Sequence, residues 1–595
     1  MGDEKSQWLE ERRTLSAELE KDPYSSEIYL RRAICHERLG YPDLAASDAY
    51  RALLLTDEVF DEEGEYHDRA VEALETVVGG QDVPAVNGVA GKGVNGVGEC
   101  VNADEEDHND DGDEDESERE PRYTAVAKDN ARRSSVILVR ALLECGDLKS
   151  AFDFVEMGLR NHPDNTELEN LKSRILGRHR SKELEKDPAW DQSNFNPRED
   201  LSEGGCVRRE IYPWNDHEPD RFSDKNLSFI NDEIKKYAPQ CEVRAVELPI
   251  LSEKPTTTSP LTINQLGIFT TAPIPPHTRV LLEPSVLTSS TRLHEPFCDA
   301  CSAPLPPHSP TSPLPACDAC EDTVFCSEMC HTRAMSLYHP AICGIQDYSI
   351  SAYDPDPRSA TSSLYTLLLA RTIAMSRTQS LHPLSLPQTK YLWGDFTPAS
   401  KPITRSLPFT FQTQIQAPLN LLSALSLDLF APQTIQYYDT WIINTLLAKF
   451  RGVANAKMNE RTGVPEVAGV HWLWSLANHS CAPNMKWEWE RGGMGFVSRG
   501  GKEVVRWGPE QRQQQRGQGQ GGNDEEEDGE EKWKGGLEAG EEVLNHYCDV
   551  ELDVRARREW AVGALGGWCL CERCVWEEGE EGRRREGEGD RGGEK

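Results

Sequence analysis

The feature that most limits how this chain can fold is a run of paired metal-type ligands between residues 298 and 343. The pairs are Cys298 and Cys301, Cys317 and Cys320, Cys326 and Cys330, and His339 and Cys343. Thiolates two residues apart can converge on one ion from a tight turn, and a Cys/His pair with three residues between can do so from one helix face. Eight ligands of this kind predict two tetrahedral zinc sites.

The segment around these ligands is rich in proline and carries little apolar volume, so hydrophobic burial alone would not fold it. Metal binding would therefore supply its folding free energy. The chain begins without an apolar signal region and has no apolar run of about 18 residues or more. We therefore expect an intracellular protein, in the nucleus, the cytoplasm or both, whose 17 cysteines stay reduced.

The formal net charge of -37 argues against broad, charge-driven binding to nucleic acid or to anionic membranes. Much of this charge lies in two acidic runs, residues 104–120 and 524–531, which we expect to be disordered. Solubilising inserts are the favoured interpretation of these runs. A basic partner such as a histone tail is the alternative.

Two stretches near the N-terminus have the pattern of two helices joined by a turn. Residues 26–57 place the turn at Gly40, and residues 135–163 place it at Gly146. In both, an alanine follows the glycine by five positions, so that a small side chain lets the second helix lie close to the first. The pattern resembles the tetratricopeptide (TPR) repeat. An ordinary helical bundle is the alternative.

The residue pattern changes at about residue 242 to short β-branched runs bounded by Pro and Gly, such as VRAVELPIL, LGIFTT and TRVLLEP. This pattern predicts strands. Apolar periodicity predicts helices at residues 362–376 and 434–451, each long enough to pack on a small sheet. Residues 507–536 indicate a low-complexity surface loop, and the last 20 residues a disordered tail.

A second cysteine cluster near the C-terminus has only three ligands, Cys569, Cys571 and Cys574. A closed structural zinc site needs a fourth ligand from elsewhere in the chain. Cys481, in the segment NHSCAPN, is the only cysteine between residues 343 and 548. We expect Cys481 to complete this site, which brings the total to about three zinc ions.

The order and spacing of the first cluster, ending in FCSEMCHTRAMSLYHPAIC, resemble the MYND zinc finger. The resemblance implies interleaved ligand pairs: Cys298, Cys301, Cys326 and Cys330 on one ion, and Cys317, Cys320, His339 and Cys343 on the other. MYND fingers mostly bind proteins, in particular proline-rich peptides. A partner-binding role is therefore implied.

Three further segments, NHSCAPN, LEAGEEVLNHYCD and WCLCERC, resemble in order the end of a SET-domain methyltransferase, and LGIFTTAPIPPHTRVLLEP looks like that family's opening β-hairpin. A SET domain split by a MYND finger is the arrangement of the SMYD-type lysine methyltransferases, and the match covers about residues 242–575. The implied fold class is multidomain α+β. It combines a β-rich SET fold, interrupted by the finger, with an α-helical TPR-like N-terminal region and a cysteine-rich post-SET segment.

The domain boundaries that we expect follow the changes of composition along the chain. They are TPR-like helices at 1–79, an acidic disordered insert at 80–122, TPR-like helices at 123–180, a linker at 181–241, the N-terminal part of SET at 242–297, the MYND finger at 298–343, the SET insert and core at 344–568, the post-SET zinc motif at 569–574 and a disordered tail at 575–595.

The resemblance also implies an S-adenosyl-L-methionine site. The residues carried over as cofactor-binding are Gly267, Asn455, Ser475, Asn478, His479, Tyr547 and Trp568. Tyr547 is also carried over as the catalytic residue, at the meeting point of cofactor and lysine. The chain departs from the family pattern at two places: Gln265 replaces the first glycine of a Gly-x-Gly, and Gly567 occupies the place of an aromatic residue, with Trp568 one position later.

The expected activity is lysine N-methylation of a histone or non-histone protein, with the finger and the TPR-like helices recruiting substrate or partners. No general base is expected, because a sulfonium methyl group is already activated and the site need only align a neutral amine and exclude water. The alternative is a catalytically inactive scaffold that binds other proteins. Direct nucleic-acid binding is disfavoured, because the chain is acidic and no basic helix lies beside a zinc site. No membrane partner is expected.

Overall fold

The computed structural model combines helices and sheets and divides into two compact units. One comprises Met1–Val207, Pro408–Phe411 and Phe430–Pro432, and the other comprises Arg208–Leu407, Gln412–Leu429 and Gln433–Lys595. The described residues are 2–79, 122–208, 210–251, 262–291, 296–307, 309, 312–320, 323–345, 360–394, 396, 405–490, 492–508, 535–565 and 567–589. Among them, no helix has both the length and the apolar character that a membrane crossing requires.

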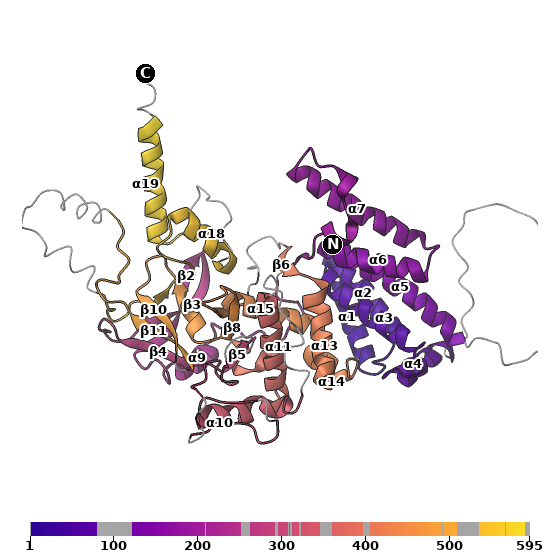
Figure 1. Cartoon of the computed structure of the whole chain (residues 1–595), viewed down its shortest axis with the longest axis horizontal. Coiled ribbons are helices and arrows are strands. Elements are labelled where there is room, and N and C mark those ends of the chain that lie inside the picture. The colour runs from indigo at the N-terminus through magenta and orange to yellow at the C-terminus, as the bar shows by residue number, and fades with distance from the viewer. Residues whose placement is uncertain are drawn as a thin grey trace, which may run out of the picture. The chain divides into compact units, whose positions relative to one another are not determined.

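The first unit is a stack of helices in which consecutive helices pack on one another (Figure 1). They are α1 (Gly2–Leu19), α2 (Ser26–Leu39), α3 (Pro42–Glu58), α4 (His67–Gly79), α5 (Arg122–Cys145), α6 (Leu148–Asn161) and α7 (Thr166–Lys186). Helix α3 packs on α5 although the residues 80–121 separate α4 from α5 in sequence. The two expected helix pairs are therefore present as α2 with α3 and as α5 with α6.

Glycine is required at both turns between paired helices. Gly40 follows α2 with φ of 81°, and Gly146 follows α5 with φ of 88°, both in the left-handed region that side chains disfavour. The alanines after Gly40, namely Ala45, Ala49 and Ala52, are completely buried. Their small side chains let α3 lie close to α2 and α5.

A buried ion pair lies among these helices. The guanidinium of Arg32 on α2 donates to the carboxylate of Asp48 on α3 at 2.8 and 2.6 Å, and both side chains are about 2% exposed or less. His36 lies 3.0 Å from the same carboxylate. Burial by itself would raise the pKa of Asp48, but Arg32 and His36 hold that pKa well below its usual range. The carboxylate therefore stays ionised inside the stack.

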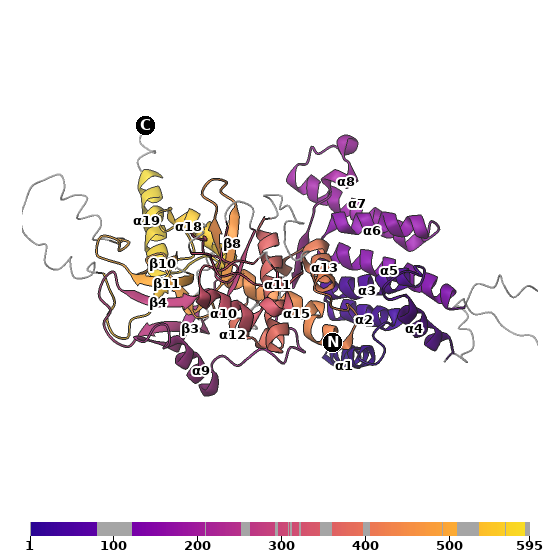
Figure 2. The ribbon, with the colours of Figure 1, turned by 60° about the horizontal axis from the view of Figure 1, so that its bottom comes forward.

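The second unit contains small sheets with helices packed against them (Figure 2). The strands are β2 (Cys241–Pro249), β3 (Thr262–Thr270), β4 (Arg279–Pro284), β5 (Leu287–Ser290), β7 (Asn455–Met458), β8 (Pro465–Val470), β9 (Asn478–His479), β10 (Met485–Glu490), β11 (Gly493–Ser498) and β12 (Leu544–Asn545). Their orders are β2-β3, β10-β11-β4, β5-β8-β7 and β12-β9. A further strand, β6, spans Arg405–Phe409.

The expected opening hairpin is not formed by β3 and β4. Strand β3 pairs antiparallel with β2, from Cys241 opposite Thr270 to Pro249 opposite Thr262. Strand β4 instead pairs with β11, far along the chain. Both strands were correctly expected from their β-branched runs, but the pattern within a strand does not determine its partner.

Helices of the second unit pack against these sheets, and two of them carry a cysteine, Cys330 in α10 and Cys574 in α19. The helices are α9 (Asp224–Ile234), α10 (Glu328–Leu337), α11 (Ala360–Gln379), α12 (Pro387–Lys390), α13 (Ala417–Ala424), α14 (Pro432–Tyr438), α15 (Thr440–Val453), α18 (Val554–Leu565) and α19 (Glu572–Gly589). Helix α11 packs on β5 and β8, and α9 packs on β2. Helix α14 and α15 together occupy the stretch 434–451 that was expected to be helical.

Two expected irregular segments contain regular structure. The linker expected at 181–241 includes the end of α7, the short helix α8 (Pro197–Asp200), strand β1 (Gly205–Arg208) and α9, whose Ile230 and Ile234 are buried. The tail expected from 575 is helical to Gly589 as part of α19. Helix α9 buries only two apolar residues, Ile230 and Ile234, four positions apart. An apolar pattern this short does not distinguish a helix from a polar linker in the sequence. The insert at 80–121, the loop at 509–534 and residues 590–595 lie outside the described residues.

Candidate metal centres and adjoining cavity

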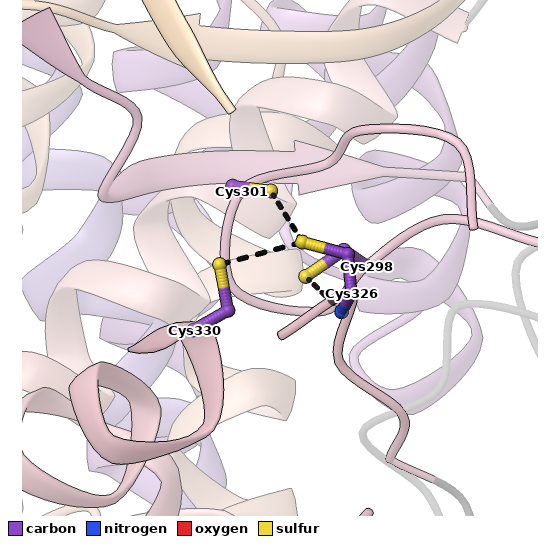
Figure 3. A group of neighbouring side chains, drawn as sticks. All are labelled: Cys298, Cys301, Cys326 and Cys330. Carbon is purple, nitrogen blue, oxygen red and sulfur yellow. Dashed lines mark hydrogen bonds between the residues drawn. The ribbon is translucent and has the colours of Figure 1, made fainter. Parts of the chain in front are cut away.

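The first cluster brings together Cys298, Cys301, Cys326 and Cys330, whose side chains point toward one another (Figure 3). The Sγ atom of Cys326 lies 3.7 Å from that of Cys301 and 3.6 Å from that of Cys330. Ser327 caps α10 by accepting from the amide of Cys330, which places that cysteine in the first turn of the helix. The amide of Cys326 donates to the Sγ atom of Cys298 at 3.3 Å. These backbone hydrogen bonds hold the thiols of Cys298, Cys326 and Cys330 close enough to bind one ion.

The second cluster brings together Cys317, Cys320, His339 and Cys343. The Sγ atoms of Cys317 and Cys343 are 3.7 Å apart, and Nε2 of His339 lies 3.4 Å from Sγ of Cys320. His339 is buried and begins the single helical turn that follows α10. The two groups alternate along the chain, as the interleaved pairing requires.

Both donor sets suit zinc. A tetrahedral ion with Zn–S bonds of about 2.3 Å holds its sulfurs about 3.8 Å apart. The sulfur–sulfur distances in the two clusters agree with this spacing, and each group keeps all its ligand atoms within 4.8 Å of one another. Each cluster could therefore hold one ion without rearrangement.

The finger is fastened to the rest of its unit by polar contacts. The hydroxyl of Tyr338 donates to the carboxylate of Asp299 at 2.7 Å. Arg371 on α11 donates to the carbonyl of Asp299 at 2.8 Å, and its guanidinium lies 3.7 Å from the centre of the Tyr338 ring. These buried contacts join both clusters to α11.

A third cluster brings together Cys481, Cys569, Cys571 and Cys574. The Sγ atom of Cys481 lies 3.9 Å from that of Cys569 and 3.4 Å from that of Cys574. Arg573 in the first turn of α19 donates to the carbonyl of Cys481 at 2.7 Å. The fourth ligand expected from the sequence is thus in position, 88 residues away from Cys569. This cluster also could hold one zinc ion.

His479 lies beside this cluster, with a ring nitrogen within 4.8 Å of the thiols of Cys481 and Cys548, but its hydrogen bonds occupy both ring nitrogens. The backbone amide of Tyr547 donates to Nδ1 of His479 at 3.0 Å, and Nε2 lies 3.3 Å from Sγ of Cys481. Burial lowers the pKa of His479 to about 4, so the ring is neutral and carries its one proton on Nε2. Nε2 therefore donates to the sulfur of Cys481.

Tyr547 is held by the paired strands β9 and β12. These strands are parallel, with Leu544 opposite Asn478 and Asn545 opposite His479. The hydroxyl of Tyr547 donates to the carbonyl of Ala477 at 2.9 Å. Burial raises the pKa of Tyr547 to about 12, and the nearby Glu542 adds to this effect. The side chain therefore remains a neutral hydroxyl at physiological pH.

Gly267 and Asn478 meet where β3 passes the segment NHSC. The side-chain amide of Asn478 donates to the carbonyl of Leu266 at 3.1 Å and to Oε1 of Glu542 at 2.7 Å. A Cβ atom on Gly267 would lie 2.5 Å from that same carboxylate oxygen and 3.0 Å from Nδ2 of Asn478. A side chain at position 267 would therefore displace the Glu542 carboxylate to which Asn478 donates. Gln265, two residues earlier, is half-buried and leaves this contact undisturbed.

A cavity of about 570 Å³ adjoins Tyr547. Its walls are formed by Arg451, Gly452, Val453, Ala454, Asn455, Trp474, Ser475, Trp487, Arg499, His546, Tyr547, Cys548, Asp549, Val550, Glu551, Trp560 and Ala564. The volume falls in the range of small-molecule and cofactor sites. Of the predicted cofactor residues, Asn455, Ser475 and Tyr547 line this cavity. Gly267, Asn478, His479 and Trp568 are not among its walls.

Several aromatic side chains of the cavity were not predicted from the sequence. Trp560 on α18 is 63% exposed and lines the cavity together with Trp474 and Trp487. Trp568, the residue carried over from the family pattern, instead packs under the guanidinium of Arg558 at 5.3 Å. The only signal for Trp560 in the sequence is its helical stretch, which does not say what the exposed ring faces.

Glu283 is a second residue that sequence reasoning missed. It is buried at the end of β4, and its carboxyl accepts the backbone amide of Trp474 at 2.8 Å. Burial raises the pKa of Glu283 to about 8, against the opposing effect of the amide hydrogen bonds. This contact fixes the short turn Trp474–Leu476 that brings Ser475 to the cavity.

The comparisons with known proteins do not assign this chain to a family. No protein-family model matches the chain, and no curated protein matches it. The clusters and the cavity are therefore the features that bear on function.

Proposed function

We propose that this protein is an S-adenosyl-L-methionine-dependent protein-lysine N-methyltransferase, with a SET-type fold interrupted by a MYND-type finger. The observation that carries the proposal is the hydroxyl of the half-buried Tyr547, which bonds to the carbonyl of Ala477 at the wall of a cofactor-sized cavity. Asn455 and Ser475, two further residues of the family pattern, line the same cavity. Zinc, held by the three clusters, would be structural.

The cofactor would supply a methyl group that is already activated by the sulfonium charge. The protein's part is to hold a neutral lysine amine in line and to keep water out. A lysine has an unperturbed pKa near 10.4, and desolvation in the cavity would favour its neutral form. Tyr547 stays uncharged, so its hydroxyl and the carbonyl of Ala477 can orient the amine without adding a charge.

The aromatic walls support the binding of a flat base and a cation. Trp474, Trp487 and Trp560 line one cavity. The faces of aromatic rings attract cations and stack on planar rings. We assign Trp560 the stacking role that the family pattern gives to the position of Gly567, because Trp568 packs against Arg558.

The other parts of the chain are assigned to recruitment. The helix pairs that meet at Gly40 and Gly146 support a TPR-like arrangement, which suits binding of an extended protein segment. The finger would bind protein partners, including proline-rich peptides, as MYND fingers do. The substrate is a lysine of a histone or of another protein.

One observation favours the alternative of an inactive scaffold. The side-chain amide of Asn478, expected at the cofactor, is occupied by the carbonyl of Leu266 and by Glu542. A cofactor that needs this amide would have to displace one of these bonds. Calorimetric titration of the full chain with S-adenosyl-L-methionine separates the two proposals, since a scaffold gives no binding heat at millimolar ligand.

The catalytic assignment is tested by replacing Tyr547 with phenylalanine. Methyl transfer to lysate proteins from a labelled cofactor should fall about 100-fold or more, the usual loss when one oriented hydroxyl or amide donor is removed from a transition state. Tyr438→Phe is the matched control, because it also removes a buried hydroxyl bond, to Ser376 at 3.1 Å, outside the cavity. Equal labelling by wild type and Tyr547→Phe would show that Tyr547 is misassigned.

A further inference from the structure

The third cluster contains one thiol more than a zinc ion needs. Cys548 is buried with the four cysteines of that cluster. Its Sγ atom lies within 4.8 Å of Sγ of Cys481 and of a ring nitrogen of His479. Cys481, Cys569, Cys571 and Cys574 already supply a complete tetrahedral set. Cys548 therefore stands beside the site without a required role in it.

A second metal ion does not account for Cys548. His479, Cys481 and Cys548 would be the ligands of such an ion. However, Nδ1 of His479 accepts the amide proton of Tyr547, so the ring proton is on Nε2, which offers no lone pair to a metal. Two thiols without a third ligand do not form a closed site.

The backbones of Cys481 and Cys548 are held next to each other by contacts that do not involve metal. Strands β9 and β12 are paired, and the amide of Ser480 continues the pairing by donating to the carbonyl of Asn545 at 2.7 Å. Arg573 then donates to the carbonyls of Cys481 and Val550, at 2.7 and 2.9 Å. Cys481 lies two residues beyond β9 and Cys548 three residues beyond β12, so both cysteines follow the paired strands closely, and their Sγ atoms lie within 4.8 Å of each other.

Cys548 is the one cysteine of this group that lines the cavity beside Tyr547, although only 4% of the residue is exposed. A small oxidant in that cavity meets Cys548 before it meets the ligand cysteines, since Cys481, Cys569, Cys571 and Cys574 are absent from its walls. Cys548 is thus both next to Cys481 and next to the cavity.

We propose that Cys548 is an oxidation site for small hydroperoxides and that its oxidation releases the metal ion of the third cluster. The peroxide O–O bond breaks, an S–O bond forms at Cys548, and the thiol proton leaves with the alcohol or water produced. The thiolate of Cys481 then attacks the sulfenic sulfur, the S–S bond forms, and hydroxide leaves and takes up a proton as water. Two electrons pass from the two thiols to the peroxide.

The disulfide removes Cys481 from the metal. Cys569, Cys571 and Cys574 remain as three ligands, too few for a closed structural site. The disulfide also joins the two segments that flank Tyr547 and His479. This inference concerns metal and thiols and does not depend on methyl transfer.

The test uses the full zinc-loaded chain and hydrogen peroxide. Peptide mass spectrometry should find Cys481 linked to Cys548, and the rate at which Cys569, Cys571 and Cys574 become alkylated reports metal loss from this cluster alone. In Cys548→Ser that alkylation should slow about tenfold or more, because ligand thiolates bound to zinc react more slowly with peroxide than a thiol that holds no metal. Cys206→Ser, which removes an exposed thiol outside the clusters, should leave the rate unchanged.

Two outcomes would overturn the proposal. In wild type, alkylation of the three cysteines while Cys548 is still reduced would show that oxidation begins elsewhere. Loss of one zinc ion from Cys548→Ser before any peroxide is added would show that Cys548 is itself a ligand. Because the first result is read in the wild-type chain, it stands even when the variant fails to fold.

Discussion

The finger at 298–343 and the helical stack α1–α7 are held together by different forces. The finger has two clusters of four ligands each within a short, proline-rich segment. The stack has a continuous apolar core, with Tyr29, Ala33 and Leu30 among its completely buried residues. With zinc bound, stability in the finger would be concentrated in the metal and its ligands, whereas in the stack it is distributed over many contacts. The two regions should fail under different conditions.

Metal removal should give the largest difference between the two regions. Structural zinc sites contribute about 10–16 kcal/mol of binding free energy, which a small finger cannot replace. After chelation, amides in the finger should exchange hydrogen at the rates of an unfolded chain, while those of α2 and α3 stay protected. Hydrogen exchange with mass spectrometry reads both regions in one sample. If the amides of the finger stay protected from exchange after chelation, the finger does not depend on metal for its folding.

Substitution of single cysteines sharpens the comparison between the candidate metal clusters. Cys481→Ser and Cys317→Ser should each lower the zinc content from about three ions per chain to about two, because each cluster needs its four ligands. Only Cys481→Ser should also loosen the cavity, since Cys481 lies two residues from His479, whose Nδ1 holds the amide of Tyr547. Elemental analysis and exchange of the peptide that contains Tyr547 measure the two effects.

An unchanged zinc content in Cys481→Ser would contradict its role as the fourth ligand. Equal loosening of the cavity in both variants would contradict the link from the third cluster to Tyr547. Cys317→Ser is thus the matched control, because it removes a ligand from a cluster that does not contact Tyr547.

Breaking the buried ion pair should destabilise the stack and leave the finger intact. Arg32→Ala leaves the carboxylate of Asp48 buried without its guanidinium partner, which costs about 3–5 kcal/mol. The free energy of local opening of α2 and α3, from hydrogen exchange, should fall by this amount with no change in zinc content. An unchanged opening free energy would show that His36 alone suffices for Asp48.

The same pair gives the stack a defined pH dependence. The pKa of Asp48 is depressed in the folded state, so its contribution is complete above the unfolded pKa of about 3.9 and is lost as the pH falls toward the folded value. The wild-type stack should therefore lose stability below about pH 4, and Arg32→Ala should lose less over that interval.

Features with a short sequence range were predictable because their geometry is local. The turns at Gly40 and Gly146 follow from a residue type that alone accepts positive φ readily, and the finger ligands follow from spacings that one turn or one helix face imposes. The strand texture of β2, β3 and β4 was also visible. The partner of β4 was not, since strand β11 lies some 200 residues further on and the pattern of one strand carries no information about the other.

At the candidate site, too, local features were predictable from the sequence and contacts between distant segments were not. The sequence by itself determined which residues can bind metal and that the C-terminal cluster lacked a fourth ligand. Only the tertiary structure decided that Trp560, rather than Trp568, faces the cavity and that His479 donates to Cys481. It alone also placed Cys548 beside a complete ligand set. The physical reason is that ligand chemistry belongs to a side chain, whereas exposure, protonation and proximity depend on segments that only the folded chain brings together.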